Sequence, residues 1–516
     1  MPDNFKRQIQ RLTDIGISLS AELNLERLLE KIVYSARELT SADAGTLYLL
    51  KDNRLHFKIL QNKSLGIFKG GCSCDEIDLE PVPLDENHAS AWCAIHDQTV
   101  RIDDVYESDE FDFSGPRHYD AITGYRSRSM LLVPMKNHEE EVIGVVQLMN
   151  AREEESGEFV SFSEQSVGLI EALASQAAVA ITNAQLIRET KDIFESLIQV
   201  LAMAIDAKSH STRNHIQKVA LFNIALARAI NEKSDGPFAD VRFSEKEMEA
   251  IRIAGWLHDV GKITTPIWVI EKKLKLEKPF NLFELIRTRF EMIKNHLRYE
   301  ASEKKLEILK NDKDAKNIGR IQSEVEQKIQ RLDEELETVH RCNQPMEKMP
   351  EDMKQKLHEI AERTYRINGK NVRLLTEEEL SHLSVQRGNL TREEINIMKN
   401  HILWTKKMLG EIPFSRHLKN VPLYAGQHHE KLNGTGYPEG AKGDEIPLHS
   451  RILAVADMYE ALTASDRSYK KSMSDELMLR VMKKAAENGE LDPRIVALLT
   501  EDHVHEQFEK EYRTKR

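Results

Sequence analysis

The spacing of apolar residues divides the chain into two parts. The first part shows both strand and helix patterns, and the second shows helix patterns alone. Five short stretches in the first part are rich in β-branched and large apolar residues, which is typical of strands. They are TLYLL (46–50), LHFKIL (55–60), TVRI (99–102), MLLVPM (130–135) and VIGVVQLMN (142–150). Residues 25–39 instead place apolar residues at helical spacing. The first part is therefore predicted to be an antiparallel sheet flanked by helices.

A long segment at residues 162–205 contains one glycine, Gly168, and no proline. It is predicted to form one long helix, or two nearly continuous ones, joining the two parts of the chain. One stripe on it alternates steps of three and four and is small in the middle: Ile170, Leu173, Ala177, Ala180, Ala184 and Ile187. This favours a parallel homodimer, regulated by rotation or shift of the helix. Packing of the stripe onto its own domain is the alternative.

The rest of the chain is predicted to be all-helical. Capping boxes at Ser244 with Glu247 and at Thr391 with Glu394 each start a helix that ends near a histidine. Between them, residues 275–375 are charged and carry apolar residues at helical spacing in two runs. This pattern favours an antiparallel helical hairpin inserted into the second domain. A structural or dimerising role is the simplest interpretation, and a cap over the site is the alternative.

The length and charge of the chain limit its function. A chain of 516 residues is too long for one ordinary core, so two or three domains are expected. The net charge of -12 argues against a broad electrostatic surface for DNA or an anionic membrane. An anionic substrate must therefore be held by local cations, either a few basic side chains or bound metal.

The cysteine content and the apolar stretches bear on the compartment. Four cysteines do not make a disulfide framework, and the start MPDNFKRQIQ has no apolar leader. A reducing cytoplasm is the simplest expectation. Apolar stretches such as residues 197–205 are much shorter than a bilayer span, so no membrane span is expected.

Histidine and aspartate recur in short helical stretches of the second part. They are His215 in TRNHIQKVA, His258 and Asp259 in GWLHDVGK, His401 in MKNHILW, His428 and His429 in QHHEKLNGTGYPEG, and Asp457 in ILAVADMY. A single such histidine is more often a core or surface residue. Adjacent pairs among apolar or small residues, however, place strong ligands where a plain core would have leucine. Without a matching cysteine cluster, this set suits iron, manganese or zinc rather than a structural zinc finger.

Five histidines and two aspartates exceed the needs of one ion, so two divalent ions sharing a carboxylate is the simplest count. Two-metal centres are well suited to phosphodiester hydrolysis, because they activate water and offset charge on the phosphoryl oxygens. In the adjoining turn, Gly434 and Gly436 permit a tight bend and Pro438 fixes its exit. Tyr437 is therefore expected to be presented beside the site.

The motif HDVGK followed by HHEKLNGTGYP resembles the HD-GYP family of metal-dependent phosphohydrolases, which hydrolyse cyclic di-GMP. With Lys262, His401 and VADMYEALTASDRSYKK, the likeness covers residues of about 195–500 apart from the insertion. The resemblance implies two bound ions, iron or manganese first and zinc, nickel or cobalt as alternatives, with Asp259 as the bridge. It implies this ligand set: His215, His258, Asp259, His401, His428, His429 and Asp457.

The same resemblance implies a set of substrate contacts. Lys262, Arg467 and Lys470 would hold phosphates, and Tyr437 would lie beside the scissile group. Solvated surface lysine is the alternative for Lys262 and Lys470.

Two positions depart from the family pattern. Some members carry a glutamate four residues before the first histidine that supports a third metal, and this chain has Ser211 there. A hydroxyl is a poor replacement, so two metals are expected rather than three. Asn433 stands where the family usually has aspartate, which removes one charge near the site.

Residues 10–188 resemble a GAF domain, from LTDIGISLSAELNL through SMLLVPM to EEVIGVVQLMN. Such domains sense small ligands or form dimers. In members that bind cyclic nucleotides an Asn-Lys pair follows the last strand, but here Ala151 follows Asn150, which weakens the case for a cyclic nucleotide and leaves an unknown small ligand or none. Cys72, Cys74 and Cys93, together with His96, offer ligands for a redox or metal sensor. Ordinary buried or surface thiols are the simpler interpretation of these cysteines.

These patterns together predict an α+β GAF domain at residues 10–188 and a connecting helix at 162–205. They predict an all-α HD-GYP helical bundle at 195–505, with the hairpin insertion at 275–375. The expected function is GAF-regulated, metal-dependent hydrolysis of cyclic di-GMP to pGpG and/or GMP. Hydrolysis of another cyclic dinucleotide such as cyclic GMP-AMP, and an inactive nucleotide-binding signalling module, are the alternatives. The intact set of ligands argues against the inactive module.

Overall fold

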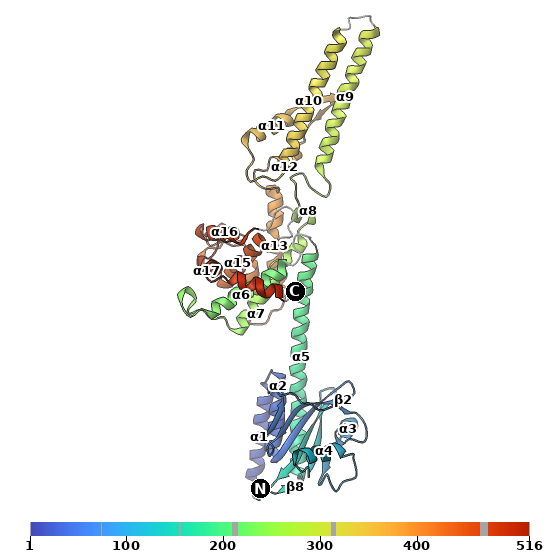
Figure 1. Ribbon diagram of the computed structural model, residues 1–516, viewed down its shortest axis with the longest axis vertical. Coiled ribbons are helices and arrows are strands. Elements are labelled where there is room, and N and C mark those ends of the chain that lie inside the picture. The colour runs from blue at the N-terminus through green and yellow to red at the C-terminus, as the bar shows by residue number, and fades with distance from the viewer. Residues whose placement is uncertain are drawn as a thin grey trace. The chain divides into compact units, whose positions relative to one another are not determined.

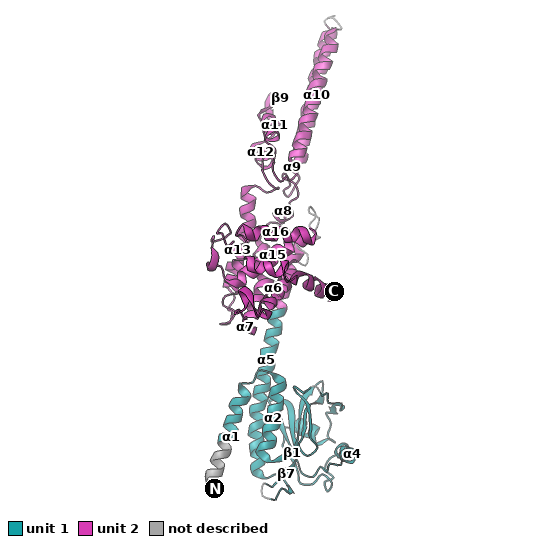
Figure 2. Ribbon diagram, turned by 60° about the vertical axis from the view of Figure 1, so that its left-hand side comes forward, with its two compact units in different colours: residues 1–195 teal, residues 196–516 magenta. Residues whose placement is uncertain are grey.

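The computed structural model describes residues 2–73, 75–153, 156–208, 215–310, 316–464 and 473–514, with the backbone alone for residues 2–9. The chain forms two compact units, Met1–Glu195 and Ser196–Arg516, coloured separately in Figure 2. Arg467, Lys470, Ser211 and Cys74, which the sequence singled out, lie outside the described residues.

The first unit is built on one antiparallel sheet. Its strands are β1 (Ala42–Lys51), β2 (Arg54–Asn62), β3 (Ile67–Gly70), β4 (Val82–Pro83), β5 (Val100–Ile102), β6 (Met130–Lys136), β7 (Val142–Arg152) and β8 (Phe159–Val160). The strand order is β3-β2-β1-β7-β6-β5, with β4 paired to β2 and β8 paired to β7. The five strands predicted from the sequence lie in β1, β2, β5, β6 and β7, so the predicted α+β sheet is confirmed.

Helices cover both sides of this sheet. Successive strand residues face opposite sides, so each side has apolar residues for helices to cover. Leu47 packs with α2 (Leu25–Thr40) and α5 (Glu164–Lys208) on one side, together with α1 (Pro2–Ser20). Its neighbour Tyr48 packs on the other side, where α3 (Ala89–His96) and α4 (Ser114–Thr123) lie. The sheet therefore has a hydrophobic core on each side, and the second side also contains a cavity.

The predicted connecting segment is a single helix, α5, of 45 residues. Ile170, Leu173, Ala177 and Ala184 of its small-residue stripe are buried in the core of the first unit, whereas Ile187 is 53% exposed. This part of the stripe thus packs onto its own domain, which is the alternative interpretation stated above. The sequence pattern could not separate the two, because a narrow apolar stripe suits either partner.

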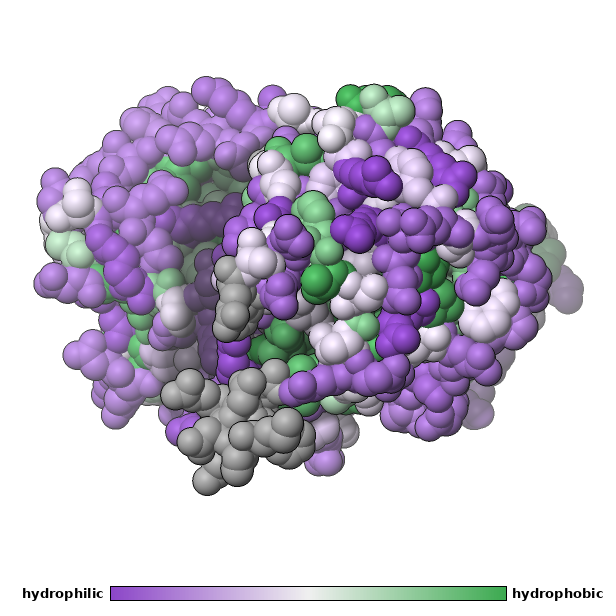
Figure 3. Space-filling model, turned by 90° about the horizontal axis from the view of Figure 1, so that it is seen from below, coloured by the Kyte–Doolittle hydropathy of each residue, from purple (hydrophilic) through white to green (hydrophobic). Residues whose placement is uncertain are grey.

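Helix α5 is long and apolar enough to cross a membrane by length and composition alone, which the short apolar stretches of the sequence did not suggest. One window of it has a mean hydropathy of 1.3, and 44% of that window is buried in the structure. Buried core helices of soluble proteins have the same length and composition, so these properties alone do not identify a span. The face drawn in Figure 3 is mostly hydrophilic, with apolar residues in separate patches.

The second unit is mainly helical around the site. Its helices are α6 (His215–Glu232), α7 (Glu245–Leu257), α8 (Ile267–Ile270), α13 (Arg392–Gly410), α14 (Val421–Gly426), α15 (Leu448–Thr463), α16 (Asp475–Glu487), α17 (Pro493–Thr500) and α18 (Val504–Thr514), with short turns η2 (Gly236–Phe238), η3 (Val260–Thr264) and η4 (Gly443–Glu445). Both predicted capping boxes are present, at the starts of α7 and α13. Helix α7 ends next to His258, as predicted, whereas α13 continues to Gly410, nine residues beyond His401, so the predicted end of a helix near His401 is wrong.

The insertion has a core of its own. Helices α9 (Leu282–Lys310) and α10 (Lys316–Cys342) lie side by side, as Figure 1 shows. They are followed by α11 (Glu351–Glu362), the strand pair β9 (Thr364–Ile367) and β10 (Lys370–Arg373), and α12 (Glu377–Leu383). This strand pair contradicts the prediction that the second part is all-helical. The sequence did not predict it, because strands of four residues are too short to show a period of two.

Candidate metal centre

Five separate segments of the second unit bring the predicted ligands together. His215 begins α6, and His258 with Asp259 follow the end of α7. His401 lies within α13, His428 and His429 follow α14, and Asp457 lies within α15. These residues are up to 242 positions apart in the sequence, since the first is residue 215 and the last is residue 457.

The ligands form two groups, His215 with His258 and Asp259, and His401 with His428 and His429. Within each group the ligand atoms lie within 4.8 Å of one another. This spacing is close enough for each group to hold one divalent ion.

The two carboxylate oxygens of Asp259 face the two groups separately. Its Oδ2 lies 3.3 Å from His215 Nε2 and 3.2 Å from His258 Nε2. Its Oδ1 lies 3.3 Å from His401 Nε2 and 4.0 Å from His428 Nε2. One carboxylate is thus placed between two sets of imidazoles, which is the arrangement of a bridging ligand.

Asp457 is the second carboxylate at the centre. Its Oδ1 lies 3.4 Å from His215 Nε2, and its Oδ2 lies 4.0 Å from His429 Nδ1. It therefore also lies between the two groups, on α15.

Backbone carbonyls fix the orientation of three site histidines. The Nδ1 atom lies 2.7 Å from Gly255 O in His258, 2.5 Å from Met398 O in His401, and 2.6 Å from Ala425 O in His428. Each carbonyl accepts the Nδ1 proton, so that Nε2 presents its lone pair toward the centre. This is the tautomer that binds a metal ion.

A carboxylate takes this role for the fourth ring. Glu460, one turn after Asp457 on α15, is hydrogen-bonded to His215 Nδ1. Glu460 was missed in the sequence analysis, although its helical spacing from Asp457 places both carboxylates on one face of α15.

Several buried polar atoms at the centre lack ordinary partners. The Nε2 atoms of His215, His258, His401 and His428, and Oδ1 of Asp259, form no hydrogen bond among the described residues. Buried polar atoms of a folded protein are nearly always satisfied. Five such atoms converging on one place fit divalent cations, so the residues present fit the group that the motif implies.

The electrostatics of the centre fit cation binding. Burial lowers the pKa of His429 to about 4, so that its imidazole is neutral and available as a ligand at neutral pH. Burial also lowers the pKa of His428 well below its ordinary value. Burial opposes ionisation of Asp259, but Lys262 and His258 outweigh it and hold the pKa of this carboxyl well below its usual range. The centre thus combines neutral imidazoles with a carboxylate.

His215 differs because two carboxylates face it. Burial lowers its pKa, but Glu460 and Asp259 outweigh burial and raise it to about 10. The imidazole of His215 is therefore expected to be protonated at neutral pH when no cation is bound, which offsets one of the two negative charges. A divalent cation would displace that proton, so metal binding at this group is expected to release it.

Lys262 lies one turn beyond Asp259, in η3. Its Nζ forms an ion pair with Asp259 Oδ2, and its backbone N–H donates to Asp259 O at 2.9 Å. The structure therefore places the ammonium group directly at the metal centre.

The glycine-rich turn places Tyr437 beside the same centre. Its ring centroid lies 4.8 Å from that of His429, and Lys399 Nζ lies 4.8 Å from the Tyr437 centroid. Lys399, on α13, was missed in the sequence analysis because nothing in its local pattern separates it from a surface lysine. A Cβ at Gly436 would lie 2.4 Å from Lys431 N, so only glycine fits there.

The carboxylate of Glu430 binds three backbone N–H groups of this turn. Its Oε1 accepts backbone N–H groups from Glu439 at 2.7 Å and Gly440 at 3.1 Å, and its Oε2 accepts that of Ala441 at 3.0 Å. The side chain is buried, at 4% exposure. Glu430 is therefore a positioning residue for the turn that carries Tyr437.

Two further side chains, those of Thr405 and Lys208, hold the loop around Asp259. Thr405 Oγ1 accepts from Gly261 N–H at 3.0 Å and donates to His258 O at 3.2 Å. From the end of α5, Lys208 Nζ donates to the carbonyls of Lys262 at 3.1 Å, Ile263 at 2.5 Å and Thr265 at 2.6 Å. The last residue of the connecting helix thus contacts the η3 turn of the site.

Comparison with protein families identifies two domains. A GAF domain model matches residues 24–181, and an HD domain model matches residues 376–495. The HD match contains His401, His428, His429 and Asp457, whereas His215, His258 and Asp259 precede it, on the other side of the insertion.

Curated proteins resemble the chain over a similar length. The 3'3'-cGAMP-specific phosphodiesterase 3 of Vibrio cholerae is 38% identical over 113 residues, which are 22% of this chain and 23% of that protein. The cyclic di-GMP phosphodiesterase response regulator RpfG of Xanthomonas campestris pv. campestris is 39% identical over 113 residues, which are 22% of this chain and 29% of that protein. The similarity thus spans less than a third of either relative.

Among solved structures, the GAF domain of an Acinetobacter phosphoenolpyruvate-protein phosphotransferase is 16% identical. It covers 36% of this chain and 98% of its own chain, with a TM-score of 0.27. The two family models show that the chain carries a GAF domain and an HD domain, and part of the chain is similar in sequence to bacterial cyclic dinucleotide phosphodiesterases.

Proposed function

We propose that the chain hydrolyses the phosphodiester bonds of cyclic di-GMP to pGpG and/or GMP, using two divalent metal ions. The observation that carries this proposal is the position of Asp259, whose two oxygens face two separate groups of histidines. The proposed ligands are His215, His258, Asp259, His401, His428, His429 and Asp457. When bound, a pair of divalent cations activates water and offsets charge on the phosphoryl oxygens.

The protein side chains would then bind and orient the dinucleotide. Lys262, beside Asp259, would hold a phosphate oxygen by its ammonium group. Tyr437, half-buried next to His429, would lie along the scissile group. Arg467 and Lys470 are proposed as further phosphate contacts. Ser211 supports a count of two ions, and iron or manganese is preferred for a site of imidazoles and carboxylates, with zinc, nickel or cobalt as alternatives.

Mass spectrometry of the reaction products tests this function. The full chain is purified without chelator or oxygen, its metal content is measured by elemental analysis, and it is incubated with cyclic di-GMP. We expect about two ions per chain and the linear dinucleotide or GMP as product. Metal-loaded protein that leaves cyclic di-GMP intact would refute the proposal. Tight nucleotide binding without turnover would favour the inactive signalling module.

The similar proteins favour 3'3'-cGAMP as a second candidate substrate. Three of the similar proteins are 3'3'-cGAMP-specific phosphodiesterases and others act on cyclic di-GMP. Competition between the two dinucleotides, measured as the ratio of their kcat/KM values, decides between them.

We further propose that the GAF domain regulates the hydrolase from within a parallel homodimer in the cytoplasm. The proposed division is a GAF domain at residues 10–188, a connecting helix at 162–205 and a hydrolase at 195–505 with its insertion at 275–375. Apolar side chains beyond the GAF core support pairing through α5, because they are exposed and recur at steps of four and three. They are Ile193 at 61%, Leu197 at 56% and Val200 at 60% exposure.

Light scattering tests the proposed homodimer. Leu197→Glu is expected to halve the mass of the particle in solution, whereas the neighbouring exposed change Gln199→Glu leaves it unchanged. A monomeric unmodified chain, or a dimer that survives Leu197→Glu, would contradict pairing through α5.

A further inference from the structure

The open side of the GAF sheet contains a cavity of about 390 Å³. This volume lies within the range of ~300–1,000 Å³ that is usual for small-molecule sites. Its floor comes from β1, β2, β6 and β7, and its walls come from the starts of α3 and α4 and from the segment around β4. The cavity lies within the first unit and shares no residue with the metal centre.

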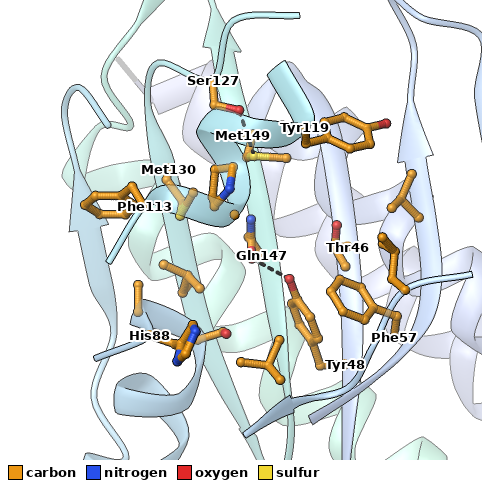
Figure 4. Close-up of a pocket in the computed structure, with 18 of the residues that line it drawn as sticks. Thr46, Tyr48, Phe57, His88, Phe113, Tyr119, Ser127, Met130, Gln147 and Met149 are labelled. Carbon is orange, nitrogen blue, oxygen red and sulfur yellow. Dashed lines mark hydrogen bonds between the residues drawn. The ribbon is translucent and has the colours of Figure 1, made fainter. Parts of the chain in front are cut away.

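The lining of this cavity is largely apolar and aromatic. The rings of Tyr48 and Phe57 pack with centroids 4.7 Å apart, and Figure 4 shows them on one side of the cavity, with Met130 and Phe113 on the other. Aromatic rings and thioethers favour flat, polarisable ligands.

The charged groups at the cavity are acidic. None of its described lining residues is lysine or arginine, while Glu80 and Asp112 are among them. Asp112 accepts the Ser114 N–H at 2.8 Å, so a carboxylate already occupies the start of α4. His88 is the basic side chain in the lining, and its Nδ1 lies 2.8 Å from Asp85. A phosphate or carboxylate ligand would meet these acids with no cation to offset its desolvation.

One buried amide provides a specific polar contact. Gln147, on β7, is 7% exposed, and its Oε1 accepts the Tyr48 hydroxyl proton at 2.8 Å. Because Oε1 of Gln147 faces Tyr48, the amide nitrogen Nε2 points the opposite way, toward Met149 (Figure 4). Nε2 donates no hydrogen bond among the described residues, so this donor is available to a ligand in the cavity.

We propose that this cavity binds an uncharged, flat and largely apolar small molecule whose carbonyl or ring nitrogen accepts a hydrogen bond from Gln147. The ligand is therefore not a cyclic nucleotide. This inference concerns the GAF domain alone and holds whatever the hydrolase acts on.

Quinoline and quinoline-4-carboxylate form a matched pair of probes, because they share a ring system with one acceptor nitrogen and differ by one negative charge. Binding of each to the full chain is measured by saturation-transfer NMR and calorimetry, with cyclic GMP as a third probe. We expect quinoline to bind, and quinoline-4-carboxylate and cyclic GMP to bind more than about tenfold more weakly.

Variants then locate the binding. Gln147→Leu is expected to weaken quinoline about three- to tenfold, since one hydrogen bond is lost. Ala44→Phe fills the cavity and should abolish binding, and Val82→Trp, at its rim, should do the same if Ala44→Phe fails to fold. Gln98→Leu, exposed and outside the lining, is the control and should bind as the unmodified chain does.

Three results would overturn the proposal. The first is equal or tighter binding of quinoline-4-carboxylate or cyclic GMP. The second is quinoline binding that survives both cavity-filling changes in folded protein, and the third is no binding of quinoline to the folded, unmodified chain.

Discussion

Replacing Glu430 is the sharpest test of how the glycine-rich turn is positioned. Its carboxylate accepts three backbone N–H groups, two at Oε1 from Glu439 and Gly440 and one at Oε2 from Ala441. In Glu430→Gln the amide oxygen can replace Oε1, but the amide nitrogen then meets the N–H of Ala441, donor against donor. The turn that carries Tyr437 should therefore loosen while the metal ligands stay in place.

The expected magnitude follows from these three contacts. A buried donor left without an acceptor costs about 1–3 kcal/mol. The two remaining hydrogen bonds change from charged to neutral acceptors and lose about half their strength. Together these changes lower the free energy of opening the turn by roughly 3 kcal/mol. Glu430→Ala removes all three acceptors and should cost still more.

Hydrogen exchange followed by mass spectrometry measures this opening directly. A loss of about 3 kcal/mol corresponds to exchange on the order of 100-fold faster at residues 439–441. The control is Glu439→Gln, which removes an exposed carboxylate of the same turn whose partner is Lys406. Exposed ion pairs contribute about 0–1 kcal/mol, so exchange there should change little.

Activity gives a second measurement of the same change. If Tyr437 orients the substrate, Glu430→Gln should lower kcat/KM with the metal content unchanged. Exchange at residues 439–441 that matches the unmodified chain in Glu430→Gln would refute the positioning role. So would equal acceleration in Glu439→Gln, because the effect would then follow charge rather than the three contacts.

Four further predictions concern the second unit. Asp259→Ala should remove bound metal and activity together, and elemental analysis that finds both ions would contradict the bridge. Lys208→Met should raise KM for cyclic di-GMP with the metal content unchanged, since three carbonyls of the η3 region lose their donor; an unchanged KM would exclude this coupling. Glu394→Gln should destabilise the unit by about 3–5 kcal/mol in urea unfolding. It leaves the fully buried Lys272 ammonium without its carboxylate, whereas the exposed Glu393→Gln should change stability by less than about 1 kcal/mol. Removal of metal by a chelator should lower the Tm, because a ligand that binds the folded state stabilises it, and an equal Tm with and without metal would count against the site.

Local patterns in the sequence were enough to identify the fold class and the candidate ligands. Strand and helix periods depend on neighbouring residues, so β1, β2, β6, β7 and the capped helices could be predicted from short windows. Adjacent pairs such as His258 with Asp259 are visible for the same reason. The strand pair β9–β10 was missed, because two strands of four residues carry too little periodic signal.

Tertiary structure alone decided which partners these elements meet. An apolar stripe shows which face of a helix is buried but not what covers it, so only the fold placed Ala177 of α5 in the GAF core. The carbonyls and carboxylates that orient the histidines, such as Glu460, act across 245 positions of sequence. The convergence of the two histidine groups on the separate oxygens of Asp259 is likewise a property of several packed segments, because distances near 3 Å between residues far apart in the chain exist only once those segments fold together.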